Sequence, residues 1–124
     1  MKVTRHLLFL FMLLPLTSLA GEAAQQQMAK ILMGINHFPN DQQKETLQGL
    51  AADSSLSEAE RTIAGALAGV QHWPSDEDKA KLVANANDAD QPQAVRDLAQ
   101  IAHDMQHKVS ADDRQVLSGI IAAK

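Results

Sequence analysis

The chain has 124 residues and no cysteine, and its 11 basic and 15 acidic residues give a formal net charge of −4. Without cysteine, the chain forms no disulfide and carries no lipid on a cysteine. The acidic excess argues against nucleic acid or an anionic membrane as a partner, because both attract basic surfaces. A chain of this length predicts a single domain with an ordinary hydrophobic core.

The first twenty residues have the pattern of a cleavable secretory signal peptide. Lys2 and Arg5 form a positive start, and the apolar run LLFLFMLLPL follows. Ser18 and Ala20 are the small residues expected at a cleavage site. The run is shorter than the roughly 20 apolar residues that a membrane span needs. We therefore expect a periplasmic or secreted protein with no membrane attachment after cleavage, and a single domain at residues 21–124.

The rest of the chain repeats one unit three times, with a period of 35 residues and no gaps. The units are residues 26–60, 61–95 and 96–124. Self-similarity at such a period is typical of helical-repeat proteins. Three columns of the aligned units are identical: Ala29, Ala64 and Ala99; Leu47, Leu82 and Leu117; and His37, His72 and His107.

Each unit predicts two short helices. In the second unit Ile63, Leu67 and Val70 recur at helical spacing, and Leu82 and Ala86 do so further along. No segment alternates apolar and polar residues, so no strand is expected. One hairpin cannot bury its apolar face alone, whereas three together can. The predicted fold is all-α: three tandem helical hairpins, or six short helices, stacked as a small α-solenoid or a compact helical-repeat bundle.

Several helix starts can be read directly from the sequence. Ser57 and Glu60 have the spacing of a capping box, in which each side chain bonds the backbone of the other residue. Asn40, Ser75 and Ser110 are the expected N-caps of the second helices. These positions recur with the period of the repeat and support the division into hairpins.

The repeated histidines His37, His72 and His107 fall where each first helix should end. An imidazole there can donate to the unpaired carbonyls of a helix C-terminus, so we expect structural turn residues. Neighbouring hairpins should stack about 10 Å apart, whereas two nitrogens bound to one metal lie within roughly 3–3.5 Å of each other. Three histidines, one per hairpin, are therefore not expected to share a metal.

A different metal site is the alternative interpretation. In the segment HDMQH at residues 103–107, His103 and His107 would lie on one face of a helix and could bind a divalent ion with Asp104. The segment resembles the zinc-protease pattern H-E-x-x-H only in part, because Asp104 replaces the general-base glutamate. No protease activity is expected from it.

The sequence contains no Gly-rich phosphate loop and no G-x-S-x-G motif. We therefore expect a non-enzymatic protein without a cofactor, which binds a protein or peptide, or itself as a homodimer, in the cell envelope. Phe38 and Trp73, each directly after a repeated histidine, are the expected partner-binding residues, since aromatic side chains dominate binding hot spots. The third unit has Lys108 at that position and is expected to be a terminal cap. The alternative is a periplasmic metal-binding or acid-stress protein that uses His103 and His107.

Overall fold

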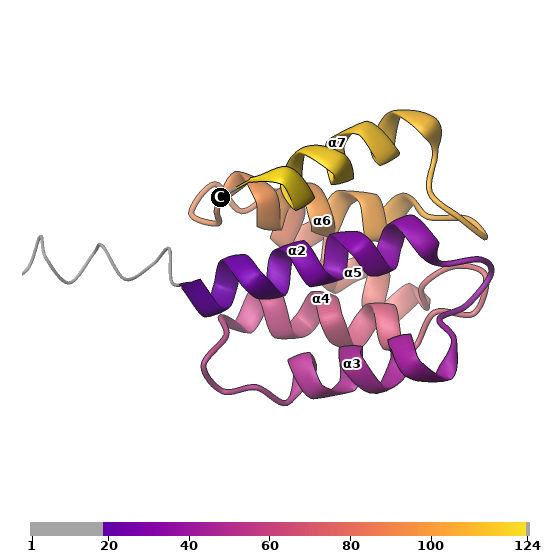
Figure 1. Ribbon diagram of the computed structural model, residues 1–124, viewed down its shortest axis with the longest axis horizontal. Helices are drawn as coiled ribbons and strands as arrows, with labels where there is room; N and C mark the ends of the chain where they lie inside the picture. Colours follow the sequence, from indigo (N-terminus) through magenta and orange to yellow (C-terminus); the bar gives the residue numbers. More distant parts are fainter. Residues whose placement is uncertain (1–18, 124) are drawn as a thin grey trace, which may run out of the picture.

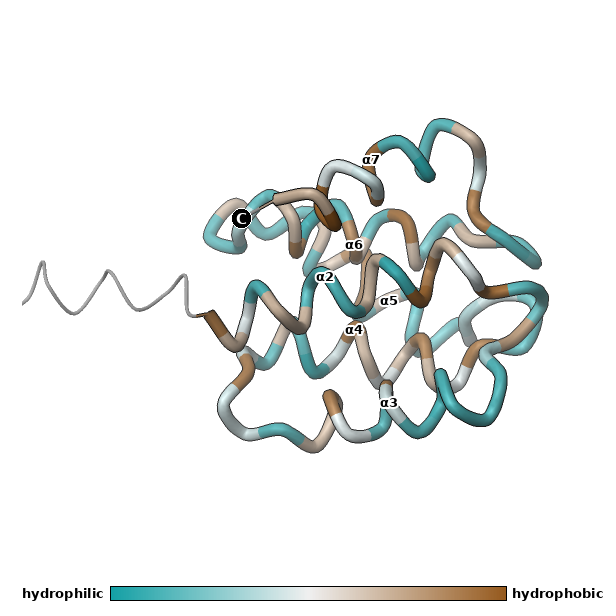
Figure 2. Tube along the Cα trace, in the orientation of Figure 1, coloured by the Kyte–Doolittle hydropathy of each residue, from teal (hydrophilic) through white to brown (hydrophobic). Residues whose placement is uncertain are grey.

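A computed structural model describes residues 19–123. In this part of the chain all regular elements are helices, so the all-α prediction with six helices is confirmed (Figure 1). Hydrophobic and hydrophilic residues intermingle along the helices, as expected where one face of each is buried (Figure 2). The helices are α2 (Leu19–Gly34), α3 (Asp41–Ala51), α4 (Glu58–Ala68), α5 (Asp76–Ala86), α6 (Gln93–Asp104) and α7 (Ala111–Ala122).

The predicted signal peptide falls almost entirely outside the described residues. Residues 1–18 belong to that undescribed part, while Leu19 and Ala20 begin α2. None of the helices between residues 19 and 123 is both long enough and apolar enough to cross a bilayer.

The first helices of the three units, α2, α4 and α6, contact one another at the centre of the molecule, and α3, α5 and α7 lie around them. Each inner helix buries five or more residues, whereas each outer helix buries one or two. Burial of one large apolar side chain stabilises the fold by about 1.5–3 kcal/mol. The fully buried repeat columns include two of large side chains: Met28, Ile63 and Leu98 on the inner helices, and Leu47, Leu82 and Leu117 on the outer helices.

Each outer helix packs most closely on the first helix of the next unit: α3 on α4 and α5 on α6. Small residues allow this approach, since a Cβ on Gly65 would lie 3.9 Å from the Cβ of Ala51. The last outer helix, α7, packs on α2 and closes the arrangement into a ring (Figure 1). Of the two expected arrangements, the molecule therefore has the compact bundle. The expectation that the third unit is a terminal cap is wrong, because that unit contacts both of the others.

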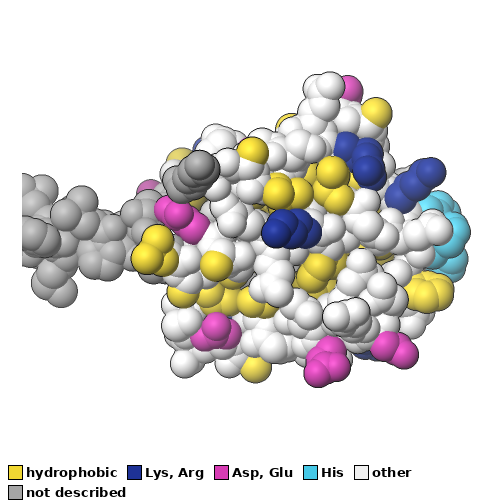
Figure 3. Space-filling model, in the orientation of Figure 1, with side chains coloured by type: hydrophobic (Ala, Val, Ile, Leu, Met, Phe, Trp, Pro, Cys, Tyr) yellow, Lys and Arg dark blue, Asp and Glu magenta, His cyan; other side chains and the backbone are white. Residues whose placement is uncertain are grey.

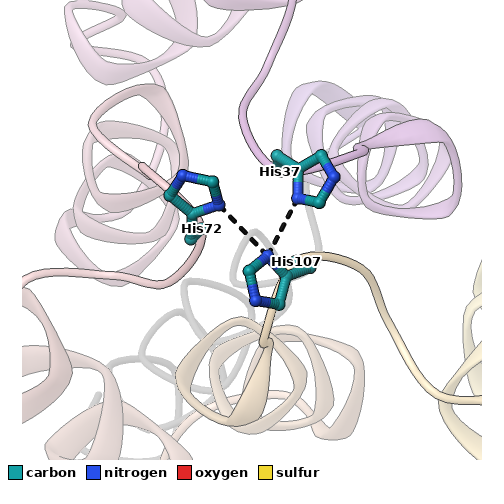
Figure 4. Close-up of side chains that lie close together, drawn as sticks. All are labelled: His37, His72 and His107. Atoms are coloured by element: carbon teal, nitrogen blue, oxygen red, sulfur yellow. Dashed lines mark hydrogen bonds between the residues drawn. The ribbon is translucent and has the colours of Figure 1, made fainter.

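The helix starts agree with the sequence. The side chain of Ser57 accepts a bond from the Glu60 N–H and that of Asn40 from the Gln43 N–H, and both pairs form complete capping boxes. Ser75 and Ser110 cap the other two outer helices through their hydroxyl oxygens. The three outer-helix caps fix where each outer helix begins, and each cap lies only three residues after a repeated histidine. The turns that carry these histidines meet at one end of the bundle (Figures 1 and 4).

Candidate metal site

The repeated histidines lie in the turns that join α2 to α3, α4 to α5 and α6 to α7. All three have a left-handed backbone, with φ of 72° at His37, 70° at His72 and 68° at His107, and no other non-glycine residue between 19 and 123 has a positive φ. This conformation favours glycine and is reached by other residues at a cost of about 1–3 kcal/mol. Three copies of a strained conformation at one repeat position point to a role for the side chain.

Backbone hydrogen bonds join the three turns in a closed cycle. The N–H of His37 donates to the carbonyl of His107 over 2.6 Å. The N–H of His107 donates to His72, and that of His72 to His37, each over 2.5 Å. The cycle therefore holds together three residues that are 35 and 70 positions apart in the chain. It also satisfies three backbone donors that a turn would otherwise leave to solvent.

The imidazole rings converge above this cycle (Figure 4). The Nδ1 atoms of His37 and His107 are 2.8 Å apart, and those of His72 and His107 are 3.1 Å apart. Potential ligand atoms of all three residues lie within 4.8 Å of one another. Two nitrogens bound to one metal at about 2.0–2.1 Å would be about 2.9 Å apart at a right angle and about 3.4 Å apart at a tetrahedral angle. The His72–His107 distance falls within this range, and the His37–His107 distance lies about 0.1 Å below it.

In the absence of a cation, the three neutral rings cannot satisfy both of the close Nδ1–Nδ1 contacts with hydrogen bonds. A neutral Nδ1 is either a donor or an acceptor, and it has one hydrogen or one lone pair. His107 faces the Nδ1 atoms of both His37 and His72, so it can complete only one good hydrogen bond. A metal ion at the centre removes the conflict, because all three nitrogens then act as electron-pair donors. The arrangement is therefore better suited to a cation than to mutual hydrogen bonds.

The site faces solvent at the end of the bundle. All three histidines are exposed, and they form a patch bordered by basic and hydrophobic side chains on the face shown in Figure 3. Phe38 and Trp73 are 57% and 51% exposed. The Trp73 ring lies 6.0 Å from the rings of both His72 and His107. The two predicted partner-binding residues therefore stand beside the histidines.

The predicted pairing of His103 and His107 on one helical face is wrong. Helix α6 ends at Asp104, so His107 lies in the turn beyond it. His103 instead pairs with its neighbour, Nδ1 to the Asp104 carboxylate over 2.8 Å. Burial acts to raise the pKa of Asp104, but hydrogen bonds from His103 and Gln100 outweigh it and hold the pKa below its ordinary value. This carboxylate is thus engaged away from the three repeated histidines.

The expectation that the repeated histidines lie too far apart to share a metal was based on a wrong separation. It assumed an open stack about 10 Å per hairpin, whereas the three units surround a common centre and bring equivalent turns together. Residues 19–123 contain no other group of three His, Cys, Asp or Glu residues with ligand atoms so close. The signal that could have identified the site is the identical histidine column combined with ring closure.

The chain matches no protein-family model, no curated protein and no solved structure.

Proposed function

We propose that this protein binds one divalent transition-metal ion, of the Zn²⁺, Cu²⁺, Ni²⁺ or Co²⁺ class, through His37, His72 and His107. The observation that carries the proposal is the convergence of three imidazoles, with two Nδ1–Nδ1 distances of 2.8 and 3.1 Å and ligand atoms of all three residues within 4.8 Å of one another. Imidazole nitrogen suits metals of this class, whereas Ca²⁺ and Mg²⁺ prefer oxygen. Export of the protein, which the sequence of residues 1–20 predicts, remains part of the proposal.

The strained turns support a role for the imidazoles beyond ending helices. Glycine would adopt the left-handed conformation without strain, yet the chain has histidine at this position in all three units. A turn alone requires no imidazole. A triad of ligands requires all three, and the backbone cycle holds them in place before the metal arrives. Such preorganisation lowers the entropic cost of binding.

The single tryptophan provides a direct test. The chain has no tyrosine, and Trp73 lies beside two of the proposed ligands. The protein, purified without a polyhistidine tag, should show saturable fluorescence quenching by Cu²⁺ with one equivalent bound. Zn²⁺ and Ni²⁺ should compete with this quenching.

The matched variants are His37→Asn and His103→Asn. Asparagine tolerates the left-handed backbone, so His37→Asn should keep the turn while it removes a ligand and weakens binding by at least about 100-fold. His103→Asn removes a histidine outside the triad and should leave the affinity unchanged. Equal affinity of His37→Asn and wild type, or loss of binding in His103→Asn alone, would contradict the proposal.

A second candidate function is binding of a protein or peptide, or of a second copy of the chain, through Phe38 and Trp73. The observation that favours it is the exposure of both large side chains at the same end of the bundle. Sedimentation of the wild type and of the Phe38→Ala/Trp73→Ala variant tests the homodimer form. If the wild type stays monomeric with and without metal, the homodimer is excluded, and Phe38 and Trp73 would then bind a different protein or peptide.

A further inference from the structure

Three histidines leave the coordination sphere of the proposed metal incomplete. Tetrahedral sites take four ligands and octahedral sites six. The triad supplies three nitrogens from one side, the side of the backbone cycle, and the exposed imidazoles leave the other side to solvent. At least one coordination position therefore faces outward, where a ligand from solution can reach it.

The charge of the proposed metal ion is also not neutralised by its three ligands. Neutral imidazoles bring no charge, so a divalent ion bound by His37, His72 and His107 alone would keep its full charge of 2+. The group of close potential ligands contains no carboxylate. Asp104, the nearest acidic residue in the sequence, accepts hydrogen bonds from His103 and from Gln100 instead. The positive charge of the metal must therefore be neutralised by a group outside the triad.

Among the residues directly next to the three histidines, the one charged side chain is basic. The three histidines are preceded by the carboxamides Asn36, Gln71 and Gln106. They are followed by Phe38, Trp73 and Lys108. All six are exposed. Lys108 is the charged one among them, and basic side chains border the histidine patch in Figure 3. Donor groups and positive charge around an open coordination position favour an anion.

A hollow of about 450 Å³ adjoins the triad on the side of His72. Phe38, Pro39 and Val70 contribute apolar side chains to its lining. Asp41 and Lys44, which carry opposite charges, also line it. This space could accommodate an added ligand without movement of the bundle.

We propose that the metal at the histidine triad takes a small oxygen-donor anion, of the carboxylate type, as an exchangeable further ligand, with Lys108 attracting it. This inference rests on the metal binding proposed above. The anion supplies both the missing donor atom and the missing negative charge. We take it from solution, because the open side of the triad is exposed and no carboxylate belongs to the group of close potential ligands; a carboxylate from a second copy of the chain is an outcome that the test below would reveal.

The test uses the protein loaded with Co²⁺, whose visible absorption reports its ligands. The protein is kept in perchlorate, a weakly coordinating salt, and titrated with acetate and, separately, with azide as a spectroscopic probe. Each anion should change the absorption bands saturably, and acetate should displace azide because both occupy one position. Sedimentation of the Co²⁺ protein before the anion is added should show a monomer.

Lys108→Gln should bind Co²⁺ as the wild type does but bind acetate about 2–5-fold more weakly, the range expected for one exposed charge. Lys81→Gln is the matched control: Lys81 pairs with Glu77 on α5, lines a different hollow, and should not affect the anion. Bound Co²⁺ with no response to either anion would overturn this inference and leave the metal site intact. A metal-linked dimer without added anion would also overturn it, in favour of a ligand from a second copy. No Co²⁺ binding at all would reject the metal proposal and this inference together.

Discussion

The two ends of the bundle differ in how closely they follow the repeat. At the histidine end, the three turns share an identical residue, nearly equal φ values and a common cycle of hydrogen bonds. At the other end, α4 begins with a complete capping box at Ser57. Helix α6 begins after Pro92, which makes no side-chain cap bond. A helix connection can thus be made in different ways within this fold. The backbone geometry of the histidine turns thus repeats at one end only, which supports the proposed role for their side chains.

The largest expected effect on stability comes from truncating a core leucine in any one of the three units. Leu47, Leu82 and Leu117 occupy one repeat column and are each 0% exposed. Truncation of each to alanine should lower the free energy of unfolding by about 2–5 kcal/mol, through lost burial and the cavity that remains. Urea denaturation of the three variants measures this. A cost below about 1 kcal/mol at one position would show that the unit concerned does not share in the common core.

Metal binding should stabilise the histidine end and with it the whole bundle. Zn²⁺ or Ni²⁺ at a hundredfold excess over its dissociation constant should raise the free energy of unfolding by about 2.7 kcal/mol. A protonated imidazole cannot bind a metal, so the increase should be smaller at pH 5.5 than at pH 7.5. Thermal melts with and without metal at both pH values measure this. His37→Asn should abolish the increase, and an unchanged increase in that variant would place the metal elsewhere.

Glycine substitutions sharpen the contrast between a strained turn and an ordinary helix. In metal-free buffer, His72→Gly should leave stability unchanged or raise it by up to about 1 kcal/mol, because relief of strain offsets the flexibility of glycine. His103→Gly, within α6, should lower stability by about 0.5–1 kcal/mol. Chemical denaturation of the two variants compares them. A larger loss in His72→Gly than in His103→Gly would show that the left-handed turn is not strained.

The smallest effect concerns Asp104, just before the third histidine turn. Although burial acts to raise the pKa of its carboxyl, hydrogen bonds from His103 and Gln100 lower it. A lowered folded-state pKa means that this interaction stabilises the protein above the unfolded value and is lost as pH falls through the folded value. NMR titration should find the Asp104 pKa higher in His103→Ala than in the wild type. An unchanged pKa would show that the bond does not persist in solution.

Much of the fold could be read from repeat columns. Apolar residues at helical spacing predicted the two helices of each unit, and Ser57 with Glu60 predicted a helix start, because these signals are local. Ring closure was not readable, since it depends on how α7 meets α2 across most of the chain. The histidine triad was missed for that reason.

The error at HDMQH could have been avoided with the repeat itself. Asp104 occupies the same column as Gly34 and Gly69, and those glycines mark the ends of α2 and α4. Helix α6 ends at the equivalent position, which separates His103 from His107. The left-handed backbone at the histidines gave no sequence signal, because glycine or asparagine is the usual mark of that conformation.

Closure of α7 onto α2 fixes the number of units at three. In open repeat arrays each unit contacts only its neighbours, so such arrays lengthen by duplication and their units can melt one after another. Here the face of α2 that a fourth unit would need is already covered by α7. Removal of any unit would expose two interfaces instead of one. Unfolding should accordingly be a single cooperative event, and the chain has no route to growth by adding copies of its own repeat.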